Sequence, residues 1–194
     1  MLARLTALIL AATALPAVAQ TYDTAAARGV LFNAEGYVVQ VSGNLSARDQ
    51  ATVRALIPVM SKEMGQDIGY YSSIAYAPDE GLISEALQGA MNYHSPVASD
   101  RAALAACDRV RRGWRPCALA GRVVPKGFSP APFTLSHGAT DAFQREYRRM
   151  RGGKSFAISP SGGTWGIGRN DAEAVAECRS AGQGARDCTV VIRD

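Results

Sequence analysis

The chain has 194 residues, of which 47% are hydrophobic and 20% are charged, and this composition is typical of a globular protein. Its formal net charge of +4 is too small an excess to indicate nucleic acid as a partner. About 175 residues follow the N-terminal segment described next, which is enough for one domain with its own core.

The first residues have the pattern of a bacterial export signal. Arg4 provides a positive start, Leu5 to Leu15 is apolar, and Ala17-Val18-Ala19 is a small-x-small cleavage site. The apolar run is shorter than the roughly 20 residues that span a bilayer, and an N-terminal membrane anchor is the alternative. No lipobox cysteine and no later membrane-spanning stretch is present. We therefore expect a signal peptide over 1–19, no transmembrane segment after its removal, and a periplasmic or secreted protein.

The first part of the mature chain, 20–72, predicts a β-hairpin. Gly29–Phe32 and Tyr37–Ser42 are apolar runs that flank the turn signal Asn33-Ala-Glu-Gly36. Glycine at the end of this turn tolerates a positive φ, which favours pairing of the two runs.

A helix is expected next. Ser46 is a suitable N-cap, with Asp49 three residues later, and Gly65 is a suitable stop. Apolar residues from Val53 onward recur at helical spacing. Pro58 lies inside this pattern and is expected to kink or break the helix.

Two later stretches have the same pattern and predict a repeated unit. Ser155–Gly163 matches Ser73–Gly81, and Asp171–Cys178 matches Asp100–Cys107. The C-terminal copy, 155–194, reads as two strands, a helix and a closing strand. The middle copy, 73–124, reads in the same way, although its segment 82–90 fits either a strand or a helix.

The connector 125–154 holds a third helical pattern. Three prolines make its first half irregular, and a helix is expected to start at Ser136 or Thr140. Together the elements predict the α+β class: a twisted, mostly antiparallel sheet with helices on one face, built from β-β-α-β units. The strand order, and a split into two lobes near Pro125, stay open.

Four cysteines in an exported protein indicate disulfides, and the repeated unit selects one of three pairings. It pairs Cys107 with Cys117 and Cys178 with Cys188. A zinc site is disfavoured because its cysteines would stand two to four residues apart rather than ten. A thiol oxidoreductase is disfavoured because no CxxC is present.

No catalytic motif stands out, and no catalytic or metal-binding residue is predicted. His94 and His137 each precede a helix and have a serine beside them, Ser95 and Ser136, as a base could stand beside a nucleophile. No Gly-x-Ser-x-Gly motif accompanies either serine. We interpret both histidines as polar loop residues near helix starts, and two isolated histidines make a poor metal centre.

Three further features have structural explanations that compete with functional ones. Asp79 and Glu80 are interpreted as solvated turn residues. The glycine-rich stretch 162–168 lacks the Walker lysine and the dinucleotide spacing, so we expect close backbone packing instead of a phosphate site. Trp165 is expected in the core, with a sugar-stacking surface as the alternative.

Two arginine clusters, at the predicted ends of helices, are the best candidates for a binding surface. Cations are favoured at helix C-termini in any case. The functional alternative is a face that binds an anion such as lipopolysaccharide, a teichoic polymer or an acidic protein, because arginine matches phosphate geometry. The candidate residues are Arg111, Arg112, Trp114, Arg115, Arg148, Arg149 and Arg151.

The C-terminal segment resembles a secreted bacterial domain of unknown function. Its members share Trp165-Gly166, an alanine-rich helix that ends in Cys178, and Cys188 before a short strand. The resemblance extends more loosely to 73–124, where the Trp-Gly pair is missing. It implies export and a disulfide, and it implies no activity.

The whole chain is also similar to short exported alphaproteobacterial proteins named 5-aminolevulinate synthase. That name implies a pyridoxal-phosphate enzyme that condenses glycine with succinyl-CoA. The lysines available for a Schiff base are Lys62, Lys126 and Lys154, and none lies in a recognisable cofactor motif. An export signal and disulfides also fit a cytosolic CoA reaction poorly, so no cofactor is predicted.

The sequence therefore predicts a non-enzymatic binding or interaction module. Its partner would be an anionic envelope component or a protein. The alternatives are an enzyme, either a small hydrolase that uses His94 or His137 or the pyridoxal-phosphate reaction, and a purely structural envelope protein.

Overall fold

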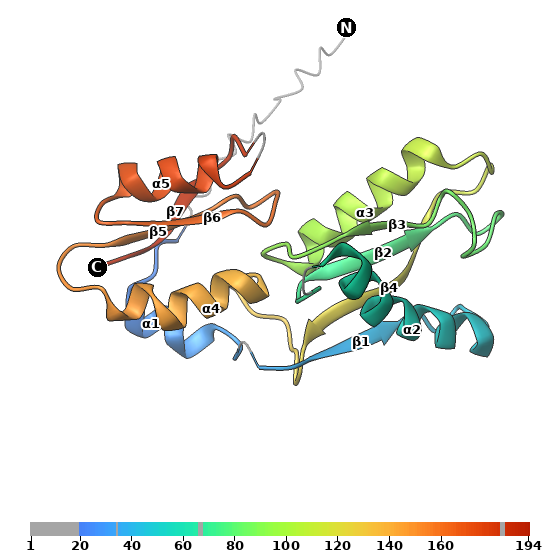
Figure 1. The fold of residues 1–194 in the computed structure, drawn as a ribbon, viewed down its shortest axis with the longest axis horizontal. Helices are drawn as coiled ribbons and strands as arrows, with labels where there is room; N and C mark the ends of the chain where they lie inside the picture. Colours follow the sequence, from blue (N-terminus) through green and yellow to red (C-terminus); the bar gives the residue numbers. More distant parts are fainter. Residues whose placement is uncertain (1–19, 34, 66–67, 183–184) are drawn as a thin grey trace, which may run out of the picture.

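The computed structural model describes residues 20–33, 35–65, 68–182 and 185–194. The predicted signal peptide lies outside these residues. Figure 1 shows two lobes side by side, each made of one sheet with its helices. The described part of the chain contains no helix that is both long and apolar enough to cross a bilayer.

The lobe on the right of Figure 1 contains a four-stranded antiparallel sheet with the order β1-β4-β2-β3. Its elements are β1 (Tyr37–Val41), α2 (Ala47–Met64), β2 (Ser72–Tyr76), β3 (Gln88–Ala90), α3 (Pro96–Val110) and β4 (Ala118–Pro125).

The other lobe contains a three-stranded antiparallel sheet with the order β6-β5-β7. Its elements are α1 (Thr24–Val30), α4 (His137–Arg145), the 3-10 helix η1 (Tyr147–Arg149), β5 (Ser155–Ile158), β6 (Trp165–Gly168), α5 (Asp171–Ser180) and β7 (Thr189–Arg193).

The two β-β-α-β units have the same topology. In each unit the first strand, β2 or β5, is central and pairs antiparallel with the second and the last strand. The register shifts between Ile74 and Ala75 in β2 and at the matching step, between Phe156 and Ala157, in β5. A one-residue irregularity at the same place bends both sheets alike.

The predicted disulfides are confirmed. Cys107 bonds Cys117 and Cys178 bonds Cys188, with a Cα–Cα distance of 6.1 Å in both. Each bond joins the last turn of a helix to the start of the next strand, and both cysteines that end a helix are fully buried.

The α+β class and the antiparallel pairing are confirmed, and the layering differs from the expectation of one sheet covered on one face. Ile74 packs with α2 residues, whereas its neighbour Ala75 packs with α3 residues. Phe156 packs with α4 residues, whereas Ala157 packs with α5 residues. Because successive side chains on a strand point to opposite faces, helices cover both faces of both sheets.

The predicted N-terminal hairpin is wrong. Residues 29 and 30 belong to helix α1, which begins after Asp23, whose carboxylate accepts a hydrogen bond from the N–H of Ala26 at 2.7 Å. Ala27 is fully buried in the core of the three-stranded lobe. β1 pairs instead with β4, and the paired residues are 80 to 88 positions apart in the sequence. Residue 34 of the expected turn lies outside the described residues.

Helix α2 begins and ends as predicted but continues through Pro58. Ser46 caps it by accepting the N–H of Asp49 at 3.2 Å, and Gly65 ends it with a φ of 62°. Val53 and Ile57 are buried against the sheet, so packing of this face holds the helix together across the missing N–H of Pro58. Most of 82–90 is neither strand nor helix, and only 88–90 joins the sheet.

Candidate functional site

The two arginine clusters predicted from the sequence lie at opposite ends of the molecule. Residues 111–117 follow α3 at the outer end of the four-stranded lobe, whereas η1 and the turn after it lie at the outer end of the other lobe (Figure 1). The clusters therefore form two separate surfaces rather than one basic face.

Carboxylates match the arginines of the first cluster. Arg111 Nε lies 2.7 Å from Asp108 Oδ1, and Arg112 Nη2 lies 2.8 Å from Glu85 Oε2. Arg115 Nε lies 3.9 Å from an oxygen of Asp79. The first cluster therefore presents little excess of positive charge.

Asp79 and Glu80 lie in a turn and are accessible to solvent, as predicted, and their carboxylates in addition fix the loop after α3. Glu80 accepts the N–H groups of Arg112 at 2.7 Å and Gly113 at 2.9 Å. Asp79 accepts the N–H of Arg115 at 2.9 Å. The bonds from Gly113 and Arg112 lower the pKa of Glu80, because they stabilise the ionised form.

This fixed loop presents an exposed aromatic side chain. Trp114 is 84% exposed, and Ile83, in the segment that carries Glu80 and Glu85, is 93% exposed. Ile83 also lines a shallow hollow of about 620 Å³, together with the leucines Leu56, Leu82 and Leu87. Large apolar side chains held this far in solvent make the loop region a second candidate surface.

The second cluster differs from the first in its ion pairs. Arg148, Arg149 and Arg151 are exposed, and among the described residues no carboxylate forms an ion pair with them. Their neighbour Arg145 pairs with Asp141 at 2.8 Å. We call Arg148, Arg149 and Arg151 the basic turn.

Lys154 fixes the backbone of the basic turn through hydrogen bonds to neighbouring carbonyl groups. Its side chain is 9% exposed, and Nζ donates to the carbonyl oxygens of Tyr147 at 3.2 Å and Met150 at 3.3 Å. The same ammonium lies 3.4 Å from Asp194 and 4.8 Å from the centre of the Tyr147 ring. The backbone that carries the three arginines is therefore fixed on both sides of Arg148 and Arg149.

The net charges of the two lobes also differ, and the lobe with the basic turn is the more positive one. Residues 34–125 contain nine Lys or Arg and nine Asp or Glu, whereas 20–33 and 126–194 together contain eleven and eight. The lobe that carries the basic turn therefore has all of the excess positive charge of the chain after residue 19.

His94 lies in the joint between the lobes and does not act on a serine hydroxyl. Its side chain is buried, Nε2 donates to Thr164 O at 2.8 Å, and Nδ1 accepts the backbone N–H of Ser136 at 3.2 Å. Burial lowers the pKa of His94 to about 4, so the ring is neutral at pH 7. The hydroxyls of Ser95 and Ser136 instead cap α3 and α4.

His137 lies at the first position of α4, where its backbone N–H donates to Tyr70 O at 2.7 Å. Its ring stands edge-on to the ring of Tyr70, with a centroid distance of 5.3 Å. The two histidines thus occupy different positions around α4.

The glycine-rich stretch packs closely, as predicted, and its contact is with α5. A Cβ atom on Gly166 or Gly168 would overlap with backbone atoms of Ala174. Trp165 is partly buried and stacks on Phe156 with a centroid distance of 5.7 Å, which agrees with the expected core position.

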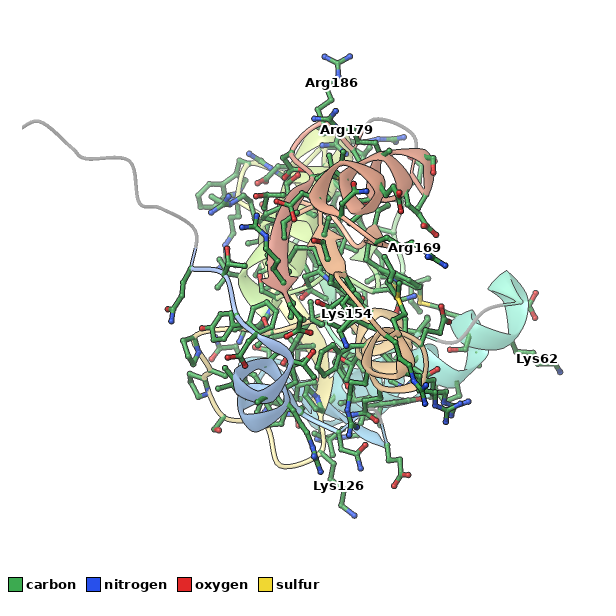
Figure 2. All side chains as sticks on the ribbon, turned by 90° about the vertical axis from the view of Figure 1, so that its left-hand side faces the viewer. Lys62, Lys126, Lys154, Arg169, Arg179 and Arg186 are labelled. Carbon is green, nitrogen blue, oxygen red and sulfur yellow. A yellow bond between two sulfur atoms is a disulfide. The ribbon has the colours of Figure 1, made fainter. Side chains whose placement is uncertain are left out.

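The three lysines considered for a Schiff base lie far apart. Figure 2 shows Lys154 inside the lobe, with Lys62 and Lys126 projecting from separate parts of the molecule. Lys154 is surrounded by the carbonyl and carboxylate oxygens already described. The fold therefore brings no two of these lysines together.

Both units contain a charged group that was not predicted from the sequence. Ser73 and Arg122 both bond the carboxylate of Asp100, and Ser155 and Arg193 both bond that of Asp171. Hydrogen bonds from Ser155, and then from Arg193, lower the pKa of Asp171. A signal was present: each arginine stands five residues after the second cysteine of its unit.

Comparison of the chain with family models, with curated proteins and with solved structures gave no match. Across 20–33, 35–65, 68–182 and 185–194, the side chains form no group of three potential metal ligands.

Proposed function

We propose that the protein is a non-enzymatic binding module that attaches to an anionic component of the cell envelope through the basic turn. The observation that carries this proposal is the contrast between the two arginine clusters. The arginines of the first cluster are matched by carboxylates, whereas Arg148, Arg149 and Arg151 are exposed without such partners among the described residues.

The geometry of the basic turn supports an anionic ligand. Guanidinium groups donate two parallel hydrogen bonds to a phosphate or carboxylate. The three arginines fall within four consecutive residues, so their Cα atoms span at most about 11 Å. Because Lys154 fixes the backbone beneath them, little ordering is needed on binding, which lowers the entropic cost of association.

Two disulfides in a chain of this size favour an oxidising compartment, so we place the module in the periplasm or outside the cell. The accessible anions there include phosphorylated glycolipids and anionic wall polymers.

The experiment is binding of the oxidised protein to immobilised lipopolysaccharide at low and at high salt. Reversal of the three charges, R148E/R149E/R151E, is expected to weaken binding at least tenfold at low salt. The wild-type affinity should fall as salt rises, because exposed charges are screened.

A matched control is R48E/R54E/R101E, which changes the net charge equally with exposed arginines of the other lobe. This control should bind within a factor of about three of the wild type, since screened charges a Debye length away contribute little. Equal losses in both triple variants would show that only net charge matters and would contradict a site at the basic turn.

A second candidate function, docking of a protein partner, is favoured by one observation, the 84% exposed side chain of Trp114 on a fixed loop. Tryptophan is enriched among the residues that dominate binding energy at protein interfaces. In this case Arg111, Arg112 and Arg115 would form the polar rim. Capture of envelope proteins on the wild type but not on W114A would support it, and identical captures would contradict it.

A further inference from the structure

A cavity of about 320 Å³ lies where the two lobes meet, apart from the basic turn and from the Trp114 loop. Its walls come from the first turn of α3, from β4 and from the connector that leads to α4. Such junctions are common places for small-molecule sites, and this volume is at the small end of their range.

Most of the wall is apolar, and it also contains one ion pair, that of Arg122 with Asp100. Val97, Phe128, Pro130 and Ala131 provide the apolar surface. Arg122 also lines the cavity, and its side chain is 41% exposed. Asp100 is only 14% exposed, so the guanidinium is the more accessible member of the pair.

The ion pair leaves part of the guanidinium available. Arg122 Nε donates to Asp100 at 2.8 and 3.0 Å, and Nη2 donates to the same carboxylate. Among the described residues, no hydrogen bond uses Nη1. Asp100 also accepts the hydroxyl of Ser73 at 2.7 Å, which further satisfies its charge. A ligand in the cavity can therefore accept hydrogen bonds from Nη1 of Arg122, next to the carboxylate of Asp100, whose charge is already balanced.

The walls are positioned before any ligand arrives. Thr134 Oγ1 donates to His94 O at 2.6 Å, and the next residues of the connector bond the His94 ring through the N–H of Ser136. These bonds hold the connector against the first lobe. The N-terminus of α3, a 15-residue helix, adds a partial positive charge at the same wall.

The second unit shows which part of this arrangement the fold itself requires. Asp171 accepts hydrogen bonds from Ser155 and Arg193, just as Asp100 accepts them from Ser73 and Arg122. The Ser–Asp–Arg group is therefore structural in both units. The apolar residues of the connector lie beside Arg122, and together with it they line the cavity.

We infer that this cavity binds a small monocarboxylate with an apolar body, with the carboxylate on Arg122 and the body against Val97 and Phe128. The volume fits a ligand of roughly four to eight carbon atoms beyond the carboxylate. The same chemistry is offered by a free short-chain acid and by the C-terminus of an apolar peptide.

The test is an NMR titration of the ¹⁵N-labelled, oxidised protein with hexanoate and, as a neutral match, hexanamide. Hexanoate should cause saturable shifts of the amide signals of Val97, Phe128 and Thr134, with at least tenfold weaker binding of hexanamide. Equal binding of the two compounds, or no saturable shift at about 50 mM, which is weaker than a useful millimolar affinity, would overturn the inference.

Two variants locate the site. R122Q should weaken hexanoate binding at least tenfold, whereas R193Q, the same substitution at the equivalent position, should bind like the wild type. V97D places a negative charge on the wall without harming α3, because aspartate is favoured in the first turn of a helix. Binding by V97D equal to that of the wild type would exclude this cavity.

Two further arms separate the alternatives. A tripeptide of apolar residues with a free C-terminus, compared with its amide, distinguishes a peptide ligand from a free acid: tighter binding of the free peptide than of hexanoate assigns the cavity to peptide ends. The variant R148E/R149E/R151E should retain hexanoate binding. If this variant loses hexanoate binding, the carboxylate binds at the basic turn instead, and the inference of a site in the cavity is overturned.

Discussion

The two β-β-α-β units share strand order, disulfide and Ser–Asp–Arg group, and they differ in the residue of the second strand that faces the helix. Gly168 pairs with Ser155 in one unit, and Ala90 occupies the equivalent place opposite Ser73 in the other. Because Gly166 and Gly168 have no side chain, the backbone of α5 packs directly on β6. Ala90 carries a Cβ at the equivalent position of the first unit, so we expect α3 to lie farther from β3 than α5 lies from β6.

The units also fix the loop after the helix from opposite sides. In the first unit the hairpin turn supplies the carboxylates of Asp79 and Glu80, which accept N–H groups of that loop. In the second unit the loop supplies Asp187, which accepts the N–H of Ser161 in the hairpin turn at 2.9 Å and the hydroxyl of Ser159. Both units therefore join the hairpin turn to the loop after the helix by hydrogen bonds to carboxylates, but the carboxylates come from the turn in one unit and from the loop in the other.

The clearest difference in stability between the two units is expected at the close contact of β6 and α5. G166A and G168A should each lower the free energy of unfolding by about 3 kcal/mol, because the added Cβ meets helix backbone that cannot move away easily. A90G, at the position equivalent to Gly168, should cost about 1 kcal/mol. Chemical denaturation measures both, and equal losses at positions 168 and 90 would contradict the difference in helix distance.

Removal of either disulfide should have a similar effect in both units. Each closes a loop of the same length, with a sequence separation of 10, so loss of either bond should cost about 3 kcal/mol in the chain-entropy model. The comparison uses C107S/C117S and C178S/C188S in denaturant titrations. A difference of more than about 1.5 kcal/mol would show that one loop is constrained by more than its cross-link.

Acidification should weaken the joint between the lobes. Burial lowers the pKa of His94 to about 4 in the folded state, against 6.5 in the unfolded chain, while the Thr164 carbonyl and Asp187 oppose this shift. The unfolded chain therefore binds the extra proton first, and stability should fall as pH drops from about 6.5 to 4, by about 3 kcal/mol in all.

Denaturation at several pH values, for the wild type and H94Q, measures this contribution. The difference between the two proteins should shrink on acidification through that window. A difference that stays constant with pH would mean that His94 contributes packing alone.

A smaller difference in stability is expected between the two Ser–Asp–Arg groups, because their aspartates are buried to different extents. D100N removes a carboxylate that is 14% exposed and bonded by Ser73 and Arg122, and it should cost about 2 kcal/mol. D171N changes a carboxylate that is 45% exposed and whose partner Arg193, at 54% exposed, can turn to water, so its cost should be clearly smaller. Equal unfolding free energies for the two variants would contradict this ranking.

Local signals determined much of the fold. Ser46 and Ser136 cap their helices as expected, and the repeated unit was sufficient to pair the cysteines. These features depend on residues a few positions apart, or on a pattern that occurs twice, and both are visible in a single sequence.

Only the tertiary structure decided the rest. The partner of β1, the second sheet and the covering of both sheet faces depend on contacts between distant segments, which compete with local turn signals such as Asn33–Gly36. The arginines that looked alike in the sequence differ because carboxylates form ion pairs with Arg111 and Arg112, whereas no carboxylate in the part of the chain that the structure describes pairs with Arg148 or Arg149. Sequence fixes where charges occur along the chain, whereas pairing and burial, which set their energies, depend on distances that exist only after folding.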